Sequence, residues 1–269
     1  MFTDSHCHLS FPELREQLPS ILDAMQQARV DRALCICTTL EEFDDVHALA
    51  TDHAQLWSTV GVHPDNEGVR EPTLDDLLSR AALPRVVGIG ETGLDYYRLN
   101  GRNVADMAWQ RERYRTHIQA GRQTDLPLVI HTRSASDDTL AILREAGSLG
   151  SGANAGLPSS RGVFHCFTET EAVARAALDL GFYISFSGIL TFRNAADLRE
   201  VARFVPLDRT LIETDSPYLA PVPYRGKTNN PSYVPHVAQQ IADIKGVPVE
   251  AVARATSANV DQLFTRMVA

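Results

Sequence analysis

Short runs of apolar residues alternate along the chain with longer segments in which apolar residues recur every three or four positions. The first pattern is typical of buried strands and the second of amphipathic helices. The pattern predicts eight strands, at Thr3–His8, Arg32–Thr38, Leu56–Val62, Val86–Glu91, Leu128–His131, Gly162–Cys166, Tyr183–Phe186 and Thr210–Glu213. It predicts helices between and after them, at Glu13–Ala28, Glu42–Asp52, Leu74–Ala81, Asp106–Thr124, Thr139–Glu145, Glu171–Leu180, Asp197–Phe204, Tyr233–Lys245 and Val249–Phe264. This alternation indicates an α/β fold, a (β/α)8 TIM barrel, in one domain over residues 1–269.

One segment interrupts the alternation. Residues 148–160 are small, polar and rich in glycine, which is typical of a surface loop. Because this segment precedes the sixth predicted strand, we expect it at the N-terminal end of the barrel, away from the chemistry. A domain boundary there is the alternative, but the number of predicted strands does not favour it.

Composition narrows the class of protein. The 269 residues are 44% hydrophobic and 22% charged, which is ordinary for a globular protein with a sizeable core. No apolar run approaches the ~18 residues of a membrane span, and the chain opens on a predicted strand, so we expect no signal peptide. The four cysteines lack the spacing of a zinc knuckle or a disulfide framework, which favours a reducing, cytoplasmic location.

The formal net charge of −9 argues against a protein that coats polyanions through a generally basic surface. It does not exclude a nuclease, because metal ions held in an acidic pocket supply the positive charge that a phosphate needs.

The first predicted strand carries two histidines one residue apart, in the run Asp4–His8. Side chains on a strand alternate between faces, so His6 and His8 point the same way, about 7 Å apart along the strand. Two imidazoles so placed are able to bind one divalent cation. Ordinary hydrogen bonding of both histidines is the alternative.

Further metal-competent residues recur at or just after the ends of predicted strands, and together with the first pair they are His6, His8, Glu91, His131, His165 and Asp215. The C-terminal ends of the strands meet at the active-site face of a (β/α)8 barrel, so these six side chains are expected to converge there. Four imidazoles and two carboxylates suit two divalent ions about 3.5–4 Å apart, with a carboxylate such as Glu91 able to bridge them.

Seven motifs give the chain a resemblance to the TatD family of metal-dependent deoxyribonucleases, within the amidohydrolase-like barrels. They are Asp4–His8, Gly61–Pro64, Gly90–Asp95, His131–Arg133, His165–Thr168, Ile212–Tyr218 and Asn259–Phe264. The resemblance implies that His6, His8 and Asp215 hold one metal ion, that His131 and His165 hold a second, and that Glu91 bridges them. Many related enzymes bridge their metals with a carbamylated lysine after the fourth strand. The two lysines, Lys227 and Lys245, lie near no predicted strand end.

Several neighbouring residues have two interpretations. His63 either donates to a phosphate oxygen or orients the loop at Pro64, and Arg133 either binds a phosphate through two N–H groups or forms a surface ion pair. Asp4 and Glu213 share strand parity with ligands, so we expect them to orient imidazoles or to act as structural carboxylates.

Two further groups lie beside the expected ligands. Cys7 and Cys166 have the opposite strand parity to those ligands, which predicts that both pack in the core. Residues 96–98, Tyr-Tyr-Arg, could contact a nucleotide.

These observations favour a hydrolase that uses two divalent ions, Mg²⁺, Mn²⁺ or Zn²⁺, to cleave DNA phosphodiester bonds. Asp215 or Glu91 would help to deprotonate the attacking water. A monomer acting from 3′ ends on single-stranded DNA, with no membrane partner, is expected; the polarity rests wholly on the resemblance. A metal-dependent amidohydrolase or esterase acting on a small or aminoacyl-type substrate is one alternative, and a non-catalytic metal-binding barrel is another.

Overall fold

The computed structural model describes residues 1–148 and 160–267. Its eight strands form one parallel sheet in sequence order. They are β1 (Phe2–Cys7), β2 (Val30–Cys35), β3 (Leu56–Val60), β4 (Val86–Asp95), β5 (Leu128–Arg133), β6 (Gly162–Phe164), β7 (Tyr183–Phe186) and β8 (Thr210–Ile212). The sheet closes on itself just beyond β8, where Asp215 N donates to His6 O at 2.9 Å and His8 N donates to Ser216 O at 2.9 Å. The predicted TIM barrel is therefore confirmed.

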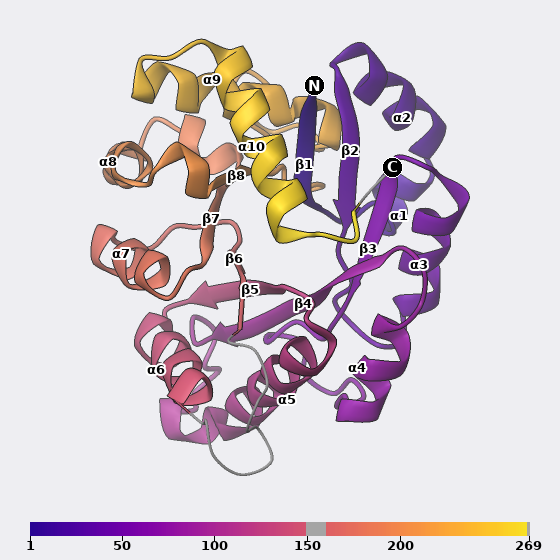
Figure 1. The fold of residues 1–269 in the computed structure, drawn as a ribbon, viewed down its shortest axis with the longest axis vertical. Helices are drawn as coiled ribbons and strands as arrows, with labels where there is room; N and C mark the ends of the chain where they lie inside the picture. The colour runs from indigo at the N-terminus through magenta and orange to yellow at the C-terminus, as the bar shows by residue number, and fades with distance from the viewer. Residues whose placement is uncertain (149–159, 268–269) are drawn as a thin grey trace.

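Helices surround the strands (Figure 1). They are α1 (Pro12–Arg15), α2 (Leu18–Gln27), α3 (Phe43–Asp52), α4 (Leu74–Ala81), α5 (Ala108–Thr124), α6 (Ser136–Ser148), α7 (Glu171–Asp179), α8 (Ala196–Phe204), α9 (Val234–Lys245) and α10 (Val249–Leu263). Short 3-10 turns add η1 (Val104–Met107), η3 (Gly188–Thr191), η4 (Leu207–Arg209) and η5 (Pro231–Tyr233). Of the segment at 148–160, residues 149–159 lie outside the described residues, so the expectation for that loop is untested.

Some predicted boundaries are wrong for identifiable reasons. The helix expected at Glu13–Ala28 is two helices, because the backbone leaves helical geometry at Gln17 and Pro19, with no N–H to donate, lies in the first turn of α2. Strand β4 continues four residues past Glu91, because its pairing with β5 shifts register between Ile89 and Thr92 and then resumes. This bulge leaves Glu91 inside a strand rather than at its end.

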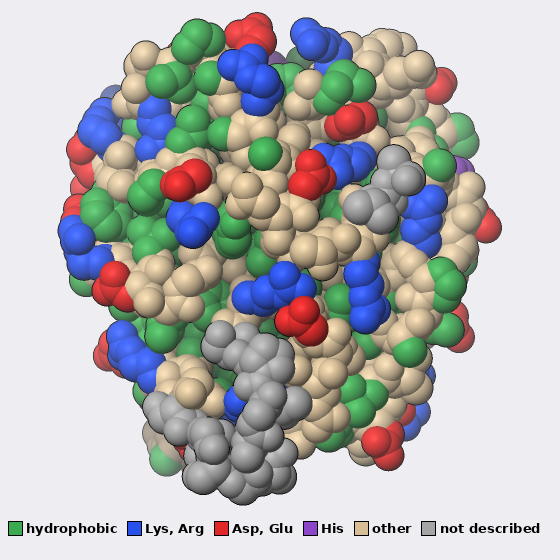
Figure 2. Space-filling view, in the orientation of Figure 1, with side chains coloured by type: hydrophobic (Ala, Val, Ile, Leu, Met, Phe, Trp, Pro, Cys, Tyr) green, Lys and Arg blue, Asp and Glu red, His purple; other side chains and the backbone are tan. Residues whose placement is uncertain are grey.

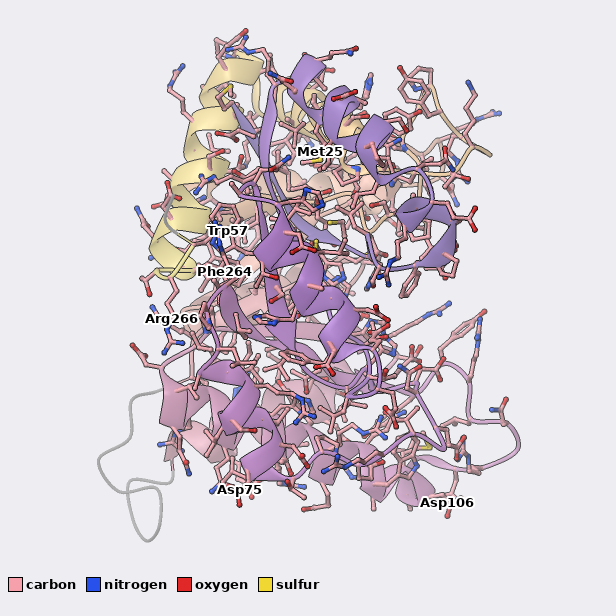
Figure 3. All side chains as sticks on the ribbon, turned by 90° about the vertical axis from the view of Figure 1, so that its right-hand side faces the viewer. Met25, Trp57, Asp75, Asp106, Phe264 and Arg266 are labelled. Atoms are coloured by element: carbon pink, nitrogen blue, oxygen red, sulfur yellow. The ribbon has the colours of Figure 1, made fainter. Side chains whose placement is uncertain are left out.

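The barrel interior has an apolar layer at its N-terminal end. Strand residues such as Trp57 and Val163 pack there against the C-terminal segment, and the whole cluster is Leu34, Ile36, Trp57, Val87, Val129, Val163, Tyr183, Leu211, Val260, Leu263, Phe264 and Met267. We refer to this cluster as the plug. Gly88 leaves space for it, since a Cβ at that position would lie 3.3 Å from the Phe264 ring. In Figure 3 Phe264 lies at one end of the barrel and Asp106, on the loops that follow β4, at the other.

Strand periodicity then places polar residues directly above this layer. Val163 on β6 points into the plug, and His165, two residues later, points to the same side of the sheet one step nearer the C-terminal end. Val129 and His131 have the same relation on β5. The apolar layer therefore lies directly beneath the polar side chains at the C-terminal ends of the strands.

Two general expectations can be checked against the described part of the chain. All four cysteines are free thiols there. Within residues 1–148 and 160–267, no helix has both the length and the apolar character that crossing a membrane requires.

Candidate metal centre

The carboxylate of Glu91 lies at the centre of the polar layer, and its two oxygens face different imidazoles. Oε1 lies 2.8 Å from His165 Nε2 and 3.3 Å from His131 Nδ1. Oε2 lies 3.4 Å from His6 Nε2 and 4.0 Å from His8 Nε2. One carboxylate therefore stands between two groups of nitrogen donors, as a bridging ligand would.

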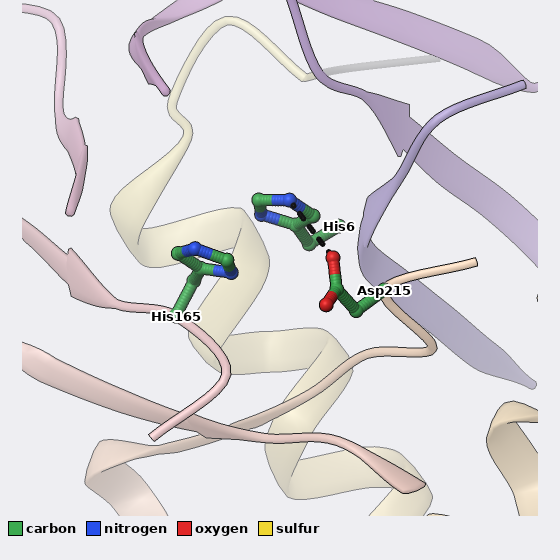
Figure 4. A group of neighbouring side chains, drawn as sticks. All are labelled: His6, His165 and Asp215. Carbon is green, nitrogen blue, oxygen red and sulfur yellow. Dashed lines mark ion pairs between the residues drawn. The ribbon is translucent and has the colours of Figure 1, made fainter. Parts of the chain in front are cut away.

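Asp215 completes the group around the first histidine pair. Its Oδ1 lies 3.5 Å from His6 Nε2 and 3.5 Å from His8 Nε2, and these two nitrogens lie 3.2 Å apart. Figure 4 shows Asp215 beside the His6 ring, which stacks on His165 with ring centroids 3.9 Å apart. The six residues expected to be ligands are therefore brought together, although His165 is close enough to share the group of His6 and Asp215.

His63 belongs to the same cluster, which the sequence interpretation did not anticipate. Its Nε2 lies 3.2 Å from Glu91 Oε1, and His63, Glu91 and His131 together form a group with the spacing of metal ligands. The expectation for His63 was contact with a phosphate or with its own loop, and the loop contact is also present, because His63 Nδ1 accepts from Asp65 N at 3.0 Å. The available signal was the one used for the other histidines, since His63 follows β3 as they follow their strands.

The donor set fits divalent cations. Neutral imidazole nitrogens and carboxylate oxygens all offer lone pairs, and here they converge from several strands into a small volume. His165 Nε2 approaches Glu91 at 2.8 Å yet has no hydrogen bond, and it is buried. Nitrogen and oxygen atoms that converge this closely are placed to hold a cation, and mixed nitrogen and oxygen donors suit Zn²⁺, Mn²⁺ and similar ions.

Electrostatics leads to the same conclusion. Burial raises the pKa of Glu91, but the charges of His165 and His63 outweigh this and hold it well below its usual range. Burial likewise raises the pKa of Asp215, while the hydrogen bond from His8 and the charge of His6 bring it below the ordinary value. Both carboxylates are therefore ionised in a buried place, which is stable only with positive charge beside them.

A second layer of carboxylates holds the imidazoles. Asp95 Oδ2 lies 3.0 Å from His131 Nε2, and Glu213 Oε1 lies 3.3 Å from His165 Nδ1. Glu213 thus does what its strand parity predicts. Asp4 takes the alternative role of a structural carboxylate: it accepts from Thr214 N at 2.9 Å and Thr214 Oγ1 at 2.6 Å, and so fixes the main chain before Asp215.

Helix α5 holds the loop that carries His63. The buried Arg113 donates to His63 O at 2.7 Å and to Asn66 O at 2.9 Å, and it also pairs with Glu71. One turn later, His117 Nε2 accepts from Val62 N at 3.0 Å. Arg113 and His117, four residues apart on one face of α5, therefore bind the main chain at His63 and just before it. The contact of Arg113 with His63 joins segments 50 residues apart in the sequence.

The cluster opens into a cavity of about 490 Å³, lined by His8, Phe11, Thr38, His63, Asn66, Glu91, His131, Thr132, Arg133, His165, Cys166, Thr168, Ile189, Asp215, Tyr218 and Leu219. Arg133 reaches its edge with the guanidinium 3.6 Å from the centre of the Tyr97 ring, and not in the surface ion pair that was its alternative. Cys166 lines the cavity, so the prediction that it packs in the core is wrong, whereas Cys7 is buried in the core. The backbone at Cys166 is left-handed, with φ of 42°, so strand alternation no longer sets its direction.

Comparison with known proteins adds a family. The sequence model described as "TatD related DNase" matches residues 3–265. An uncharacterized metal-dependent hydrolase of Escherichia coli K12, YcfH, is 46% identical over 265 residues, covering 97% of this chain and 94% of that protein. The 3′-5′ ssDNA/RNA exonuclease TatD of Citrobacter rodentium is 35% identical over 243 residues, covering 88% of each. Among solved structures, the TatD homolog YJJV of E. coli K12 has a TM-score of 0.85 at 26% identity, covering 98% of both chains.

Proposed function

The chain belongs to the TatD-related DNase family, and from this premise we propose that it is a metal-dependent hydrolase of DNA phosphodiester bonds. The observation that carries the proposal is the position of Glu91, whose two oxygens face two groups of histidines at the floor of an open cavity. A two-ion site of this kind is suited to displacement at phosphorus, where attacking and leaving oxygens both need stabilisation.

The two carboxylates, Glu91 and Asp215, differ in exposure, and we assign them different roles for that reason. Divalent ions, when bound, supply Lewis-acid charge and make water more acidic. Glu91, whose side chain is 3% exposed, holds the two groups together, while Asp215, at 16%, faces the cavity and is placed to accept a proton from water. Arg133 offers two parallel N–H donors to the oxygens of the phosphate.

Three finer parts of the proposal rest on other grounds. The 3′-to-5′ direction follows from the name of the relative from C. rodentium, which is 35% identical. The single-stranded substrate is proposed from the same name, and the choice of Mg²⁺, Mn²⁺ or Zn²⁺ from the mixed nitrogen and oxygen donors. We propose a monomer because the cluster is complete within one chain.

The test measures metal content and nuclease activity on the same preparation. The purified protein is analysed for metals, stripped with a chelator, reloaded separately with Mg²⁺, Mn²⁺ and Zn²⁺, and assayed on oligonucleotides labelled at the 5′ or 3′ end. We expect two ions per chain and stepwise shortening from the 3′ end that the chelator abolishes. Hydrolysis of a panel of esters and amides without any cleavage of DNA would overturn the proposal in favour of a carbonyl hydrolase.

A further inference from the structure

Three cationic side chains lie on segments that follow strand ends, where Arg133 lines the cavity and Arg225 and Lys227 come shortly after its lining residues Tyr218 and Leu219. Among the described residues, Arg133, Arg225 and Lys227 form no ion pair, and each lies over an aromatic ring instead. The pairs are Arg133 over Tyr97 at 3.6 Å, Arg225 over Phe192 at 3.7 Å and Lys227 over Tyr224 at 5.6 Å. We refer to these three residues as the rim cations.

The rim cations stand on opposite sides of the barrel. Arg133 ends β5, whereas Arg225 and Lys227 follow β8, and in a closed barrel of eight strands β5 lies across from β8 and β1. Figure 2 shows the opposite end of the molecule, where acidic and basic side chains are intermixed. Cations without ion pairs on both sides of the cavity, in a chain of net charge −9, favour the binding of an anion between them.

The segment that carries Arg225 and Lys227 is fixed to the metal centre. Asn229, which is fully buried, donates through Nδ2 to Thr214 O at 2.9 Å and to Tyr218 O at 2.6 Å, on either side of Asp215. On its other flank, Val222 N donates to Thr191 Oγ1 at 2.9 Å, beside Phe192. The two cations therefore keep a constant position relative to the centre.

Tyr218 adds an exposed aromatic side chain to the cavity and lies in the chain between Asp215 and the segment of Arg225 and Lys227. Its side chain lines the cavity and the residue is 55% exposed. An exposed ring in a cavity that Arg133 also lines is suited to single-stranded nucleic acid, because unpaired bases stack on the ring while cations contact phosphates. A base held in a duplex does not present its face in this way.

We propose that the rim cations and Tyr218 form a track for a single-stranded polynucleotide that crosses the mouth of the cavity. Arg133 contacts the chain near the bond to be cleaved, and Arg225 and Lys227 contact phosphates further along it. This inference rests on the proposed function and extends it, because it makes the preferred substrate a chain of several nucleotides and not a single phosphodiester.

The experiment compares a long substrate with a short one. The double variant Arg225→Gln/Lys227→Gln is assayed on a dT12 oligonucleotide and on bis(4-nitrophenyl) phosphate at several NaCl concentrations. The matched control is Arg209→Gln/Arg254→Gln, which removes the same charge near the N-terminal end of the barrel, where Arg209 also lies over an aromatic ring, Tyr183. Binding of labelled dT12 is measured separately by fluorescence anisotropy in EDTA.

We expect kcat/KM on dT12 to fall at least tenfold in the rim variant and to stay unchanged on the small diester. Each phosphate contact contributes about 0.7 to the slope of log affinity against log salt for single strands, so two lost contacts should reduce that slope by about 1.4. Tyr218→Ala should weaken binding of dT12 more than binding of an abasic oligomer of equal length.

Several results would overturn the inference. Equal losses in the rim variant and its control would mean a general charge effect, and equal losses on both substrates would mean damage to the centre. Binding of dT12 in EDTA that matches the wild type would exclude the track even if the wild type cleaves nothing. Binding that weakens as expected, in an enzyme with no cleavage of either phosphodiester, would refute the proposed function while leaving the track.

Discussion

Arg113 offers a direct test of how the fold positions the metal centre. Replacement by methionine keeps an unbranched apolar stem but removes the guanidinium, and with it both hydrogen bonds to the loop of His63 and the contact with the Trp109 ring. Hydrogen bonds with a charged partner contribute about 1.5–3 kcal/mol each, and the ion pair with the exposed Glu71 contributes little. Because methionine also relieves the burial of a guanidinium, we expect a net loss of about 2–4 kcal/mol, which lowers Tm by roughly 4–16 °C in a chain of this size.

The loss of stability is separable from the effect on the centre. A displaced loop moves His63 away from Glu91, which should weaken metal binding by about 10–100-fold, as removal of other supporting contacts does. Metal affinity is measured by chelator competition at 25 °C, where the variant is still folded by circular dichroism. Arg111→Met is the control, since Arg111 lies on the same helix and also donates to two carbonyl oxygens, those of Val104 and Ala105. A lower Tm with wild-type metal affinity would show that Arg113 supports the fold alone.

Three other perturbations have defined outcomes. Glu91→Gln keeps the shape but loses the charge facing both histidine groups, so metal content and turnover should collapse while the circular dichroism spectrum persists; activity within tenfold of wild type would exclude a bridging role. Burial lowers the pKa of His117 to about 4, below its unfolded value, so the stability it contributes is complete above pH 6.5 and is lost as the pH falls toward 4. Between pH 7 and 5 this amounts to about 2 kcal/mol in urea unfolding, and His117→Gln should lack that part of the pH dependence. Arg133→Lys should lower kcat/KM on DNA by roughly 10–100-fold and on a neutral ester very little, with metal content unchanged, whereas equal losses would indicate that Arg133 only supports the fold around His131.

The sequence predicts those parts of the site that follow from strand periodicity. His131 and His165 lie two residues beyond apolar positions that point into the barrel, so a pattern of period two places them above the plug. Glu213 follows Leu211 in the same way and reaches His165. Local pattern is sufficient here because the extended backbone fixes the direction of each side chain.

Prediction fails where the backbone departs from a regular strand or where a contact joins distant segments. The left-handed backbone at Cys166 turns its side chain into the cavity, against the parity of β6. The pairing of Asp95 with His131 depends on the bulge in β4, and Arg113 meets His63 across 50 residues that no periodicity relates. These features depend on register and packing, which a single sequence does not express as a pattern.

The two ends of the barrel are linked by charge as well as by strands. The cluster of apolar side chains lies below Glu91 and lowers the local dielectric constant, so the buried carboxylates interact strongly with charge above them. Positive charge must then reach the centre from the mouth, through bound cations and through side chains placed there. On our proposal the rim cations serve this purpose, since a carboxylate beside Arg225 or Lys227 would weaken their attraction for a polyanion on a chain whose net charge is −9. On the proposed function, this arrangement would let an acidic protein bind nucleic acid at the cavity and repel it elsewhere.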